Sequence, residues 1–426
     1  MTYAAALALL HSLRQFGFQP GLDVPRRLAA LAGDPQARLR FLHVAGTNGK
    51  GSVCALLESV HRAAGRRTGL YTSPHLVRFG ERIQVDRKPI PDADLARLTG
   101  WLQERVVASE PALQPTFFEF TTVLALCWFA EQRVDLVIWE TGLGGRWDAT
   151  NIVLPLAAVV TNIGWDHQHI LGNSLTAIAG EKAGIFKPGV PAFTAAQDPE
   201  ALAVLESRAR ELNTSLDVIG PEQVGALGYE VALAGEHQRW NAALAAAVVR
   251  SLHPVLPVTE QQLRHGLETV VWPGRLQMIR RGSQTLLLDG AHNRDGIVAL
   301  RAALAGRYDG VRPAVVFGML SDKEWQAMAR ELAPVAGRIV TVPVSSMRTV
   351  SAEDLRAACL EVAGTRMVEA VQSVDAALRA VAGEPFVLVT GSLYLVGEVL
   401  EYLGEGVAGH AERSLNEWGG GVTGHL

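Results

Sequence analysis

The sequence predicts an α/β protein of two domains, each built around a largely parallel sheet. The chain has 426 residues, more than one ordinary hydrophobic core supports, so two domains are expected. Short apolar runs rich in β-branched residues alternate with longer segments rich in Ala and Leu, as in βα units. Most of these runs end in Gly, Asn, Asp or Thr. Ligands of such sheets bind at the carboxyl ends of strands, so we look for chemistry there.

The predicted elements divide the chain near residue 272. Buried strands are expected, in chain order, within residues 40–46, 134–142, 156–164, 285–293, 312–320, 337–344 and 385–392, with a further short strand before Ser73. An Ala-rich helix over 241–252 closes the first domain, and a Pro-Gly break at 273–274 precedes a fresh strand. We therefore predict domains 1–271 and 272–426. The Gly-rich tail, 414–426, is expected to fray.

The composition gives no general reason to expect binding to nucleic acid or to a membrane. The formal net charge is -4 and no window approaches the roughly 20 apolar residues of a membrane span. The N-terminus lacks a basic start and a cleavage site, so a signal peptide is not expected. Cys54, Cys127 and Cys359 lack metal-ligand spacing, which favours buried thiols in a reducing cytoplasm. Any anionic ligand must then be bound by local groups.

The stretch "FLHVAGTNGKGSV" reads as an apolar strand, a Gly-rich turn and the start of a helix. Backbone N–H groups at such a turn favour an anion, and Lys50 can reach phosphate oxygens, with Thr47 or Ser52 near a phosphate or a metal. Its spacing departs from the usual phosphate loop. Val44 stands where the first glycine belongs, and Gly51 separates Lys50 from Ser52. The alternative, a plain strand-to-helix turn, does not explain why Lys and three glycines coincide.

Three further segments follow predicted strands of the first domain. Glu140 ends an apolar run, where a carboxylate is costly unless it binds a metal or a cation. His167 follows the next run, and with Glu140 it would suit Mg²⁺ or Mn²⁺, although a lone histidine is usually structural. Ser73 could ligate a metal and Arg82 could bind a carboxylate-rich substrate, unless this segment is an ordinary loop with solvated arginines. Trp147 stands where a dinucleotide fingerprint needs a small residue, which argues against a nicotinamide site.

Polar residues of the second domain could complete a shared site. Arg275 lies beside the junction, and Asp289, His292 and Asn293 follow a predicted strand. Such groups could reach a ligand bound at the first domain. Alternatively, they are turn and capping residues.

Eight motifs in order resemble the folylpolyglutamate synthase/dihydrofolate synthase family of the Mur ligase superfamily. They are "HVAGTNGKGS", "YTSPHL", "TFFEFTT", "ETGLGGRWDATN", "DHQHILG", "EKAGIF", "WPGRL" and "DGAHN". The resemblance implies an N-terminal domain with a phosphate loop, a smaller Rossmann-like C-terminal domain and an active site between them. It also implies an ATP-dependent ligase that adds L-glutamate to dihydropteroate, to the γ-carboxylate of reduced folates, or to both. The reaction would pass through an acyl phosphate and release ADP and phosphate.

The resemblance also implies roles for individual residues. The expected ATP contacts are Thr47, Asn48, Gly49, Lys50, Gly51, Ser52, Asn241, Arg275, Asp289 and His292. Ser73, Glu140 and His167 would bind Mg²⁺, with two ions expected, and the expected catalytic residues are Lys50, Glu140, His167 and Lys182, the last carried as N6-carboxylysine. The pterin or folate would contact Arg82, Thr116, Phe117, Phe118, Glu119, Trp147, Asp148 and Ala149. The chain departs from the family pattern at Arg294, often Pro, and at Trp147, commonly an apolar residue such as Leu.

Two other functions are weighed against this one. A peptidoglycan-type Mur ligase shares the phosphate loop, but "TSPHL" and "DGAHN" argue against it, as do the only about 40 residues before the loop. An ATP-binding switch without ligase activity would not need Glu140, His167 and Lys182 together. We expect a cytoplasmic monomer with small-molecule substrates only.

Overall fold

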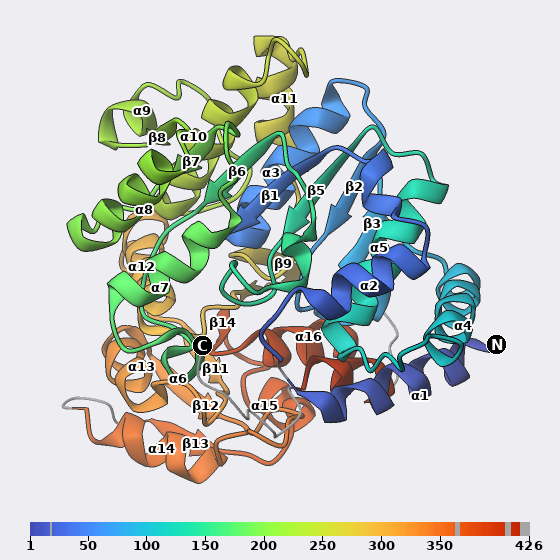
Figure 1. Cartoon of the computed structure of the whole chain (residues 1–426). Coiled ribbons are helices and arrows are strands. Elements are labelled where there is room, and N and C mark those ends of the chain that lie inside the picture. Colours follow the sequence, from blue (N-terminus) through green and yellow to red (C-terminus); the bar gives the residue numbers. More distant parts are fainter. Residues whose placement is uncertain (18, 363–366, 405–409, 418–426) are drawn as a thin grey trace.

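The computed structural model describes residues 1–426 except 18, 363–366, 405–409 and 418–426 (Figure 1). Its strands are β1 (Phe41–Ala45), β2 (Thr68–Tyr71), β3 (Ile83–Val85), β4 (Lys88–Pro89), β5 (Leu136–Glu140), β6 (Ala157–Val160), β7 (Ala192–Thr194), β8 (Leu216–Val218), β9 (Gln277–Arg281), β10 (Gln284–Leu288), β11 (Ala314–Phe317), β12 (Arg338–Thr341), β13 (Val368–Ala370) and β14 (Phe386–Thr390). Its α-helices are α1 (Tyr3–Leu13), α2 (Asp23–Leu31), α3 (Lys50–Ala63), α4 (Asp92–Val107), α5 (Phe117–Glu131), α6 (Gln168–Leu171), α7 (Leu175–Lys182), α8 (Pro199–Glu211), α9 (Pro221–Gly225), α10 (Glu236–Ser251), α11 (Glu260–Thr269), α12 (Arg294–Arg307), α13 (Trp325–Leu332), α14 (Ala352–Leu360), α15 (Val374–Ala380), α16 (Leu393–Tyr402) and α17 (His410–Arg413).

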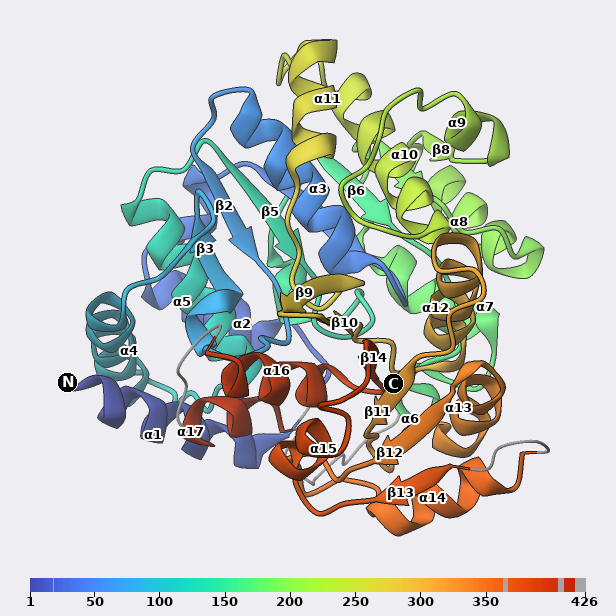
Figure 2. The ribbon, with the colours of Figure 1, turned by 180° about the vertical axis from the view of Figure 1, so that it is seen from behind.

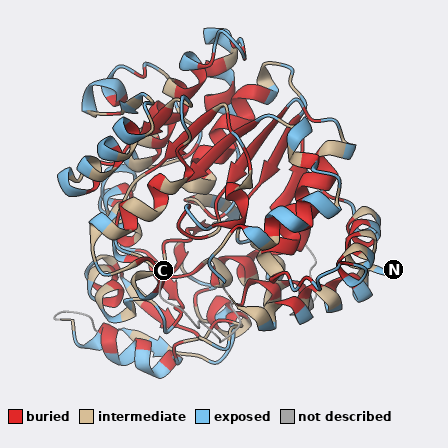
Figure 3. Ribbon diagram, in the orientation of Figure 1, coloured by how far each residue is buried: buried red, intermediate tan, exposed pale blue. Residues whose placement is uncertain are grey.

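The first part of the chain forms an eight-stranded sheet in the order β4-β3-β2-β5-β1-β6-β7-β8. All neighbours from β2 to β8 are parallel, and β3 and β4 continue one edge as antiparallel strands. Successive side chains of β1 point to opposite faces, so Leu42 and Val44 pack toward α3 and Phe41 packs toward α5. The central strands are buried from both sides (Figure 3).

The rest of the chain forms a six-stranded sheet in the order β13-β12-β11-β14-β10-β9, with only β9 antiparallel to its neighbour. One face packs on α12, α13 and α14 through Leu287, Val315 and Phe317, and the other on α15 and α16 through Leu286 and Val316. The two sheets lie one above the other in Figures 1 and 2. No described helix is long and apolar enough to cross a membrane.

The predicted fold class is confirmed, and each predicted buried strand overlaps an observed one. The sequence pattern missed β3, β4, β7, β8 and β13, because segments of two or three residues carry little periodicity. It also missed β9, an antiparallel edge strand of five residues that is mostly polar and exposed. The change of sheet falls between β8 and β9, while Trp272 still packs against α3 of the first sheet. The domain boundary at residue 272 stays a prediction.

Two expectations outside the sheets have different outcomes. Cys54, Cys127 and Cys359 are buried free thiols, as predicted. The tail prediction is wrong for residues 414–417, because Leu415 is buried in the core formed with α1 and α5. Residues 418–426 lie outside the described part of the chain.

Candidate active site

The phosphate loop lies between β1 and α3, at the carboxyl end of the first sheet. Gly46 and Gly49 have φ angles of 149° and 83°, which favour glycine. The loop is tied to the segment after β6: Asn162 accepts from the backbone N–H groups of Thr47 (2.9 Å) and Asn48 (2.7 Å). The Thr161 hydroxyl donates to the Asn48 carbonyl at 2.6 Å. Neighbouring strand ends therefore fix the loop before any ligand binds.

Two lysines meet at the Gly46 carbonyl oxygen. Lys50 Nζ donates to it at 3.1 Å and also reaches the Thr47 carbonyl, and Lys182 Nζ donates to it at 2.9 Å. Burial, and then the positive charge of Lys50, lower the pKa of Lys182 to about 7. A substantial fraction of Lys182 is therefore a neutral amine near pH 7.

Glu140 ends β5 beside the loop, since Val44 of β1 is its register partner. Its carboxylate accepts from the backbone N–H of Ser73 at 3.2 Å. Burial raises the pKa of Glu140 to about 7, against the opposing effect of Lys50. The structure thus brings Ser73 and Glu140 together, as a shared ligand site requires.

His167 begins α6 in the left-handed region, with φ 51°. Its ring lies 3.8 Å from Asp166, and burial, then Lys323, lower its pKa well below the ordinary value, so the ring is neutral. Among the described residues, no group of three or more His, Cys, Asp and Glu side chains is arranged for a metal. The predicted donors are instead a hydroxyl, a carboxylate and a neutral imidazole, a donor set that suits a divalent ion completed by phosphate oxygens.

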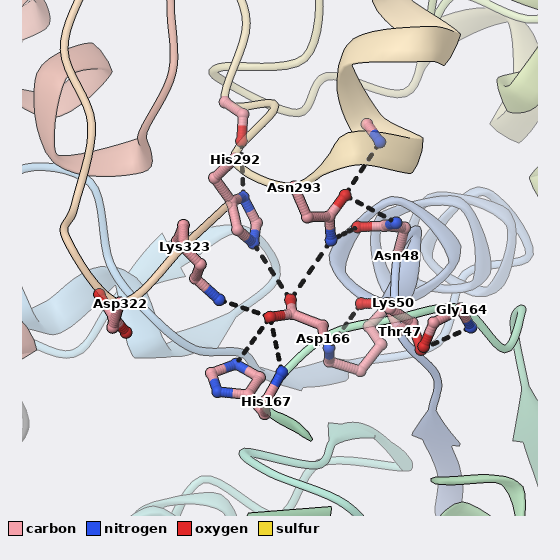
Figure 4. A network of polar contacts seen from close by, with 12 residues as sticks. Thr47, Asn48, Lys50, Gly164, Asp166, His167, His292, Asn293, Asp322 and Lys323 are labelled. Atoms are coloured by element: carbon pink, nitrogen blue, oxygen red, sulfur yellow. Dashed lines mark hydrogen bonds and ion pairs between the residues drawn. The ribbon is translucent and has the colours of Figure 1, made fainter. Parts of the chain in front are cut away.

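Asp166 is the centre of a polar network that joins the two sheets (Figure 4). Lys323 Nζ donates to its carboxylate at 2.6 Å, Asn293 donates at 3.3 Å, and the His292 ring lies 3.8 Å away. Burial alone would raise the pKa of Asp166, but the positive charge of Lys323, which also donates a hydrogen bond to the carboxylate, holds this pKa well below its ordinary value. Asp166 is therefore a buried anion beside the phosphate loop, and it binds Lys323 and Asn293 from the second half of the chain.

Asn48 of the phosphate loop pairs with Asn293, the N-cap of α12. Each side-chain amide donates to the other, at 3.2 and 2.9 Å. Asn293 also accepts from the Gly296 N–H, which fixes it at the start of its helix. The loop is thus in direct contact with the "DGAHN" turn.

The remaining expected ATP residues differ in how directly they could reach a ligand. Asp289 accepts from the backbone N–H groups of Leu276 and Ala291 at 3.0 Å, so it holds the turn that carries His292. Asn241 and Ser52 are linked through Gln238, which contacts both side chains. The Asn241 side chain also closes the space beside Gly49.

The expected folate residues form the opposite wall. Thr116 and Glu119 cap the start of α5 reciprocally, with bonds of 2.7 and 3.2 Å. Asp148 is buried and accepts from the N–H groups of Gly142 and Leu143. Trp147 is exposed, and the Phe117 ring lies 5.4 Å from the Arg82 guanidinium. Capping and turn formation thus account for several of these polar groups, whether or not they contact a ligand.

One cavity of about 280 Å³ connects the two walls. Of the expected site residues it is lined by Thr47, Asn48, Gly49, Lys50, Ser73, Arg82, Thr116, Phe117, Phe118, Glu119, Glu140, Trp147, Asp148, Ala149, His167, Lys182, Arg275 and His292. Its lining does not include four of the expected ATP residues, Gly51, Ser52, Asn241 and Asp289.

Sequence reasoning missed several residues of the cavity wall. They are Arg14, Lys323, Arg348, Tyr394 and Asn416, together with Asp166, which begins the "DHQHILG" motif but has no expected role. None of the first five lies in a recognisable motif. Only contacts between distant segments bring them to the site.

Comparisons with known proteins agree with this architecture. Residues 274–393 match the family model "Mur ligase, glutamate ligase domain". The chain is 38% identical over 427 residues to the dihydrofolate synthase/folylpolyglutamate synthase of Bacillus subtilis, covering 94% of this chain and 99% of that one. Folylpolyglutamate synthase of Mycobacterium tuberculosis, solved with ADP and AMPPCP, superposes with a TM-score of 0.84 at 32% identity, covering 94% and 99% of the two chains. Escherichia coli FolC, solved with DHPP and ADP, gives a TM-score of 0.84 at 31% identity, covering 95% and 98%.

Proposed function

We propose, since the chain belongs to the folylpolyglutamate synthase/dihydrofolate synthase family, that it is an ATP-dependent ligase that adds L-glutamate to folates. The observation that carries this proposal is the cavity, which places the phosphate loop, the Glu140–Ser73 pair and the aromatic wall of α5 around one space. We extend the proposal to both dihydropteroate and the γ-carboxylate of reduced folates as acceptors. The Bacillus subtilis relative is named dihydrofolate synthase/folylpolyglutamate synthase, and this double name supports the extension.

In the proposed reaction, a carboxylate oxygen of the folate attacks the γ-phosphorus of ATP, and ADP leaves. The amine of glutamate then attacks the acyl carbon, phosphate leaves and the amine loses a proton. Lys50 and the N–H groups of the loop stabilise the charge that develops on the phosphate oxygens. Arg275 and His292 face the same cavity from the second sheet, where they would contact ATP and limit access of water to the acyl phosphate.

Ser73, Glu140 and His167 would hold Mg²⁺, whose positive charge would assist phosphoryl transfer. The fit rests on a carboxylate that is buried beside a backbone N–H and on an imidazole that is neutral. Glu140 must give up its proton to bind a cation, and its raised pKa makes it ready to exchange one near neutral pH. We propose two ions, as in the family resemblance.

We propose that Lys182 carries a carbamate. The neutral amine would attack carbon dioxide and release a proton, which leaves an anionic carbamate in place of the neutral amine. Its lowered pKa and its crowding by Lys50 at the Gly46 carbonyl support this assignment, because only the unprotonated amine reacts. The anion would pair with Lys50 and complete the acidic side of the site.

The pterin would lie between α5 and the turn at Trp147–Ala149, with Phe117 or Phe118 stacking on the heterocycle. Thr116, Glu119 and Asp148 offer polar contacts there, and Arg82 offers a positive charge. We also propose a cytoplasmic location, which the three buried free thiols support, and a monomer.

The proposal is tested by the substrate dependence of ADP release. Turnover of ATP by the purified chain should require both glutamate and a pterin acceptor. ADP release indifferent to both would exclude the ligase. Mass spectrometry of products should show one added glutamate on dihydropteroate and also on tetrahydrofolate, and a gain on only one of them would reject the bifunctional assignment.

A further inference from the structure

The C-terminal segment, residues 412–417, packs against the loop that follows β2 in the first sheet. The ring of His75 donates to the Glu412 carbonyl at 2.9 Å, and the Phe79 N–H donates to the Glu412 carboxylate at 2.8 Å. Glu412, Asn416 and Glu417 are all buried. Because buried polar groups need partners, these contacts fix the segment in place. It begins in the last turn of α17 and comes after α16, so it connects this part of the second half of the chain to the first sheet (Figure 2).

Asn416 is the residue of this segment that contacts both sheets. Its side-chain oxygen accepts from the Arg82 guanidinium at 2.7 Å, and its amide donates to the His75 carbonyl at 2.8 Å. Its backbone carbonyl accepts from the Tyr394 hydroxyl, on α16 of the second sheet. Asn416 therefore holds Arg82 from the second sheet's side of the cavity.

Arg82 is a buried cation whose hydrogen-bond partners, Asn416 and His75, carry no charge. Its second bond goes to Nδ1 of His75, at 2.9 Å. A ring nitrogen that accepts this bond carries no proton, and Nε2 of the same ring donates to the Glu412 carbonyl, so the ring is in its neutral form. Within the described part of the chain, no carboxylate lies within ion-pair distance of Arg82, which is only 4% exposed. Buried charges are normally paired, and Arg82 lines the cavity beside Phe117. Its positive charge is thus available to an anion that enters the cavity.

We propose that Asn416 is a positioning residue, which holds the Arg82 guanidinium through a neutral acceptor so that its charge meets a carboxylate of the folate substrate. This inference rests on the proposed function, because that function supplies the carboxylate. A neutral amide suits the task, since it orients the guanidinium without cancelling its charge. Asn416 is then part of the substrate site, while Arg413 of the same segment lies outside the cavity lining.

The test compares KM for tetrahydrofolate, KM for ATP and kcat in the full chain. Asn416→Ala should raise KM for tetrahydrofolate about tenfold, the equivalent of one hydrogen bond to a charged group, with little change in KM for ATP. Asn416→Asp keeps the size and the acceptor oxygen but neutralises Arg82, so it should raise this KM at least as much. Arg413→Ala is the matched control: it lies on the same segment, pairs with Glu401 away from the cavity, and should leave KM unchanged.

A double mutant separates positioning from general stability. In an Arg82→Ala background, Asn416→Ala should add almost nothing to KM, since the two residues act as one unit. Wild-type KM in Asn416→Asp, additive effects in the double mutant, or an equal rise in Arg413→Ala would each overturn the inference. Thermal unfolding of every variant shows whether it is folded. A wild-type chain that turns over no folate would instead reject the proposed function itself.

Discussion

Lys182 and Lys50 place two side-chain amines on one carbonyl oxygen, that of Gly46. Two protonated amines at this distance repel each other, and burial adds to the cost of a charge at Lys182. The pKa of Lys182 therefore falls from its ordinary value of 10.5 to about 7. Burial and the charge of Lys50 destabilise the protonated form of Lys182, and the neutral amine that they favour is the form that reacts with carbon dioxide.

The lowered pKa of Lys182 should make the free energy of unfolding depend on pH. Between about pH 7 and about pH 10, the unfolded chain keeps a proton on Lys182 that the folded chain has lost. The free energy of unfolding contributed by this residue should therefore rise with pH across that range. In buffer freed of carbon dioxide, Lys182→Met should be more stable than the wild type near pH 7, and the difference should shrink toward pH 10. Denaturant unfolding of both proteins measures it.

Bicarbonate provides the companion measurement. If Lys182 is carboxylated, added bicarbonate should raise the Tm of the wild type near pH 8, because carbon dioxide would then bind to the neutral amine of the folded chain and stabilise that state. It should leave the Tm of Lys182→Met unchanged. An equal response of both proteins, or none in either, would count against the carbamate.

The phosphate loop is set by the packing of its glycines on neighbouring elements. A Cβ on Gly46 would lie 1.8 Å from the Thr161 hydroxyl, and one on Gly51 would lie 3.0 Å from the Trp272 ring. Thr161 also bonds the Asn48 carbonyl, so the segment after β6 and the loop are built against each other. The close approach of Thr161 thus requires a glycine at position 46 of this loop.

Gly46→Ala should disrupt this element. The new methyl group clashes with Thr161, and φ 149° is strained for any residue with a side chain. We expect ATP affinity to fall at least about tenfold and the free energy of unfolding to fall by about 2 kcal/mol. Isothermal titration with ATP and denaturant unfolding measure the two effects.

Gly225→Ala is the matched control for this substitution, because nothing lies within 4 Å of its Cβ position and its φ is not positive. It should bind ATP like the wild type. Equal ATP affinity in Gly46→Ala and Gly225→Ala would show that the loop does not depend on this close approach.

The two sheets meet across the cavity, and Asp166 is the main polar link between them (Figure 4). The Asp166 and Lys323 side chains are each only 10% exposed. Breaking a buried pair by removing one partner leaves the other charge without compensation, which is costlier than removing both. This pair therefore ties the relative placement of the sheets to the phosphate loop.

Removing either partner alone should cost about 3 kcal/mol of unfolding free energy. Asp166→Asn or Lys323→Met would do this, while the double variant should be more stable than either single one. Denaturant unfolding of the four proteins gives the coupling energy. Arg97→Ala is the control, since its pair with Glu131 is exposed and should be worth less than about 1 kcal/mol. A double variant that loses the sum of the single effects would show that the two residues act independently.

Much of this protein could be predicted from local sequence. The strands β1, β5, β6, β10, β11, β12 and β14, the phosphate loop and the polar residues at strand ends are encoded in runs of a few residues. Parallel strands place their carboxyl ends at one edge, so the sequence also indicated that Lys50, Glu140 and His167 would face one site. The cavity contains all three.

Only the tertiary structure decided how the two halves complete this site. Lys323 is 157 positions from Asp166, Asn293 is 245 from Asn48, and Asn416 is 334 from Arg82. No periodicity links residues so far apart, and their pairing depends on how the helices of both sheets pack. The sequence by itself therefore determined the local elements and the phosphate loop, because short-range geometry specifies them. Three features depend on which side chains become buried together, and only the folded chain defines this. They are the uncharged hydrogen-bond partners of Arg82, the partners of Asp166 and the position of the C-terminal segment.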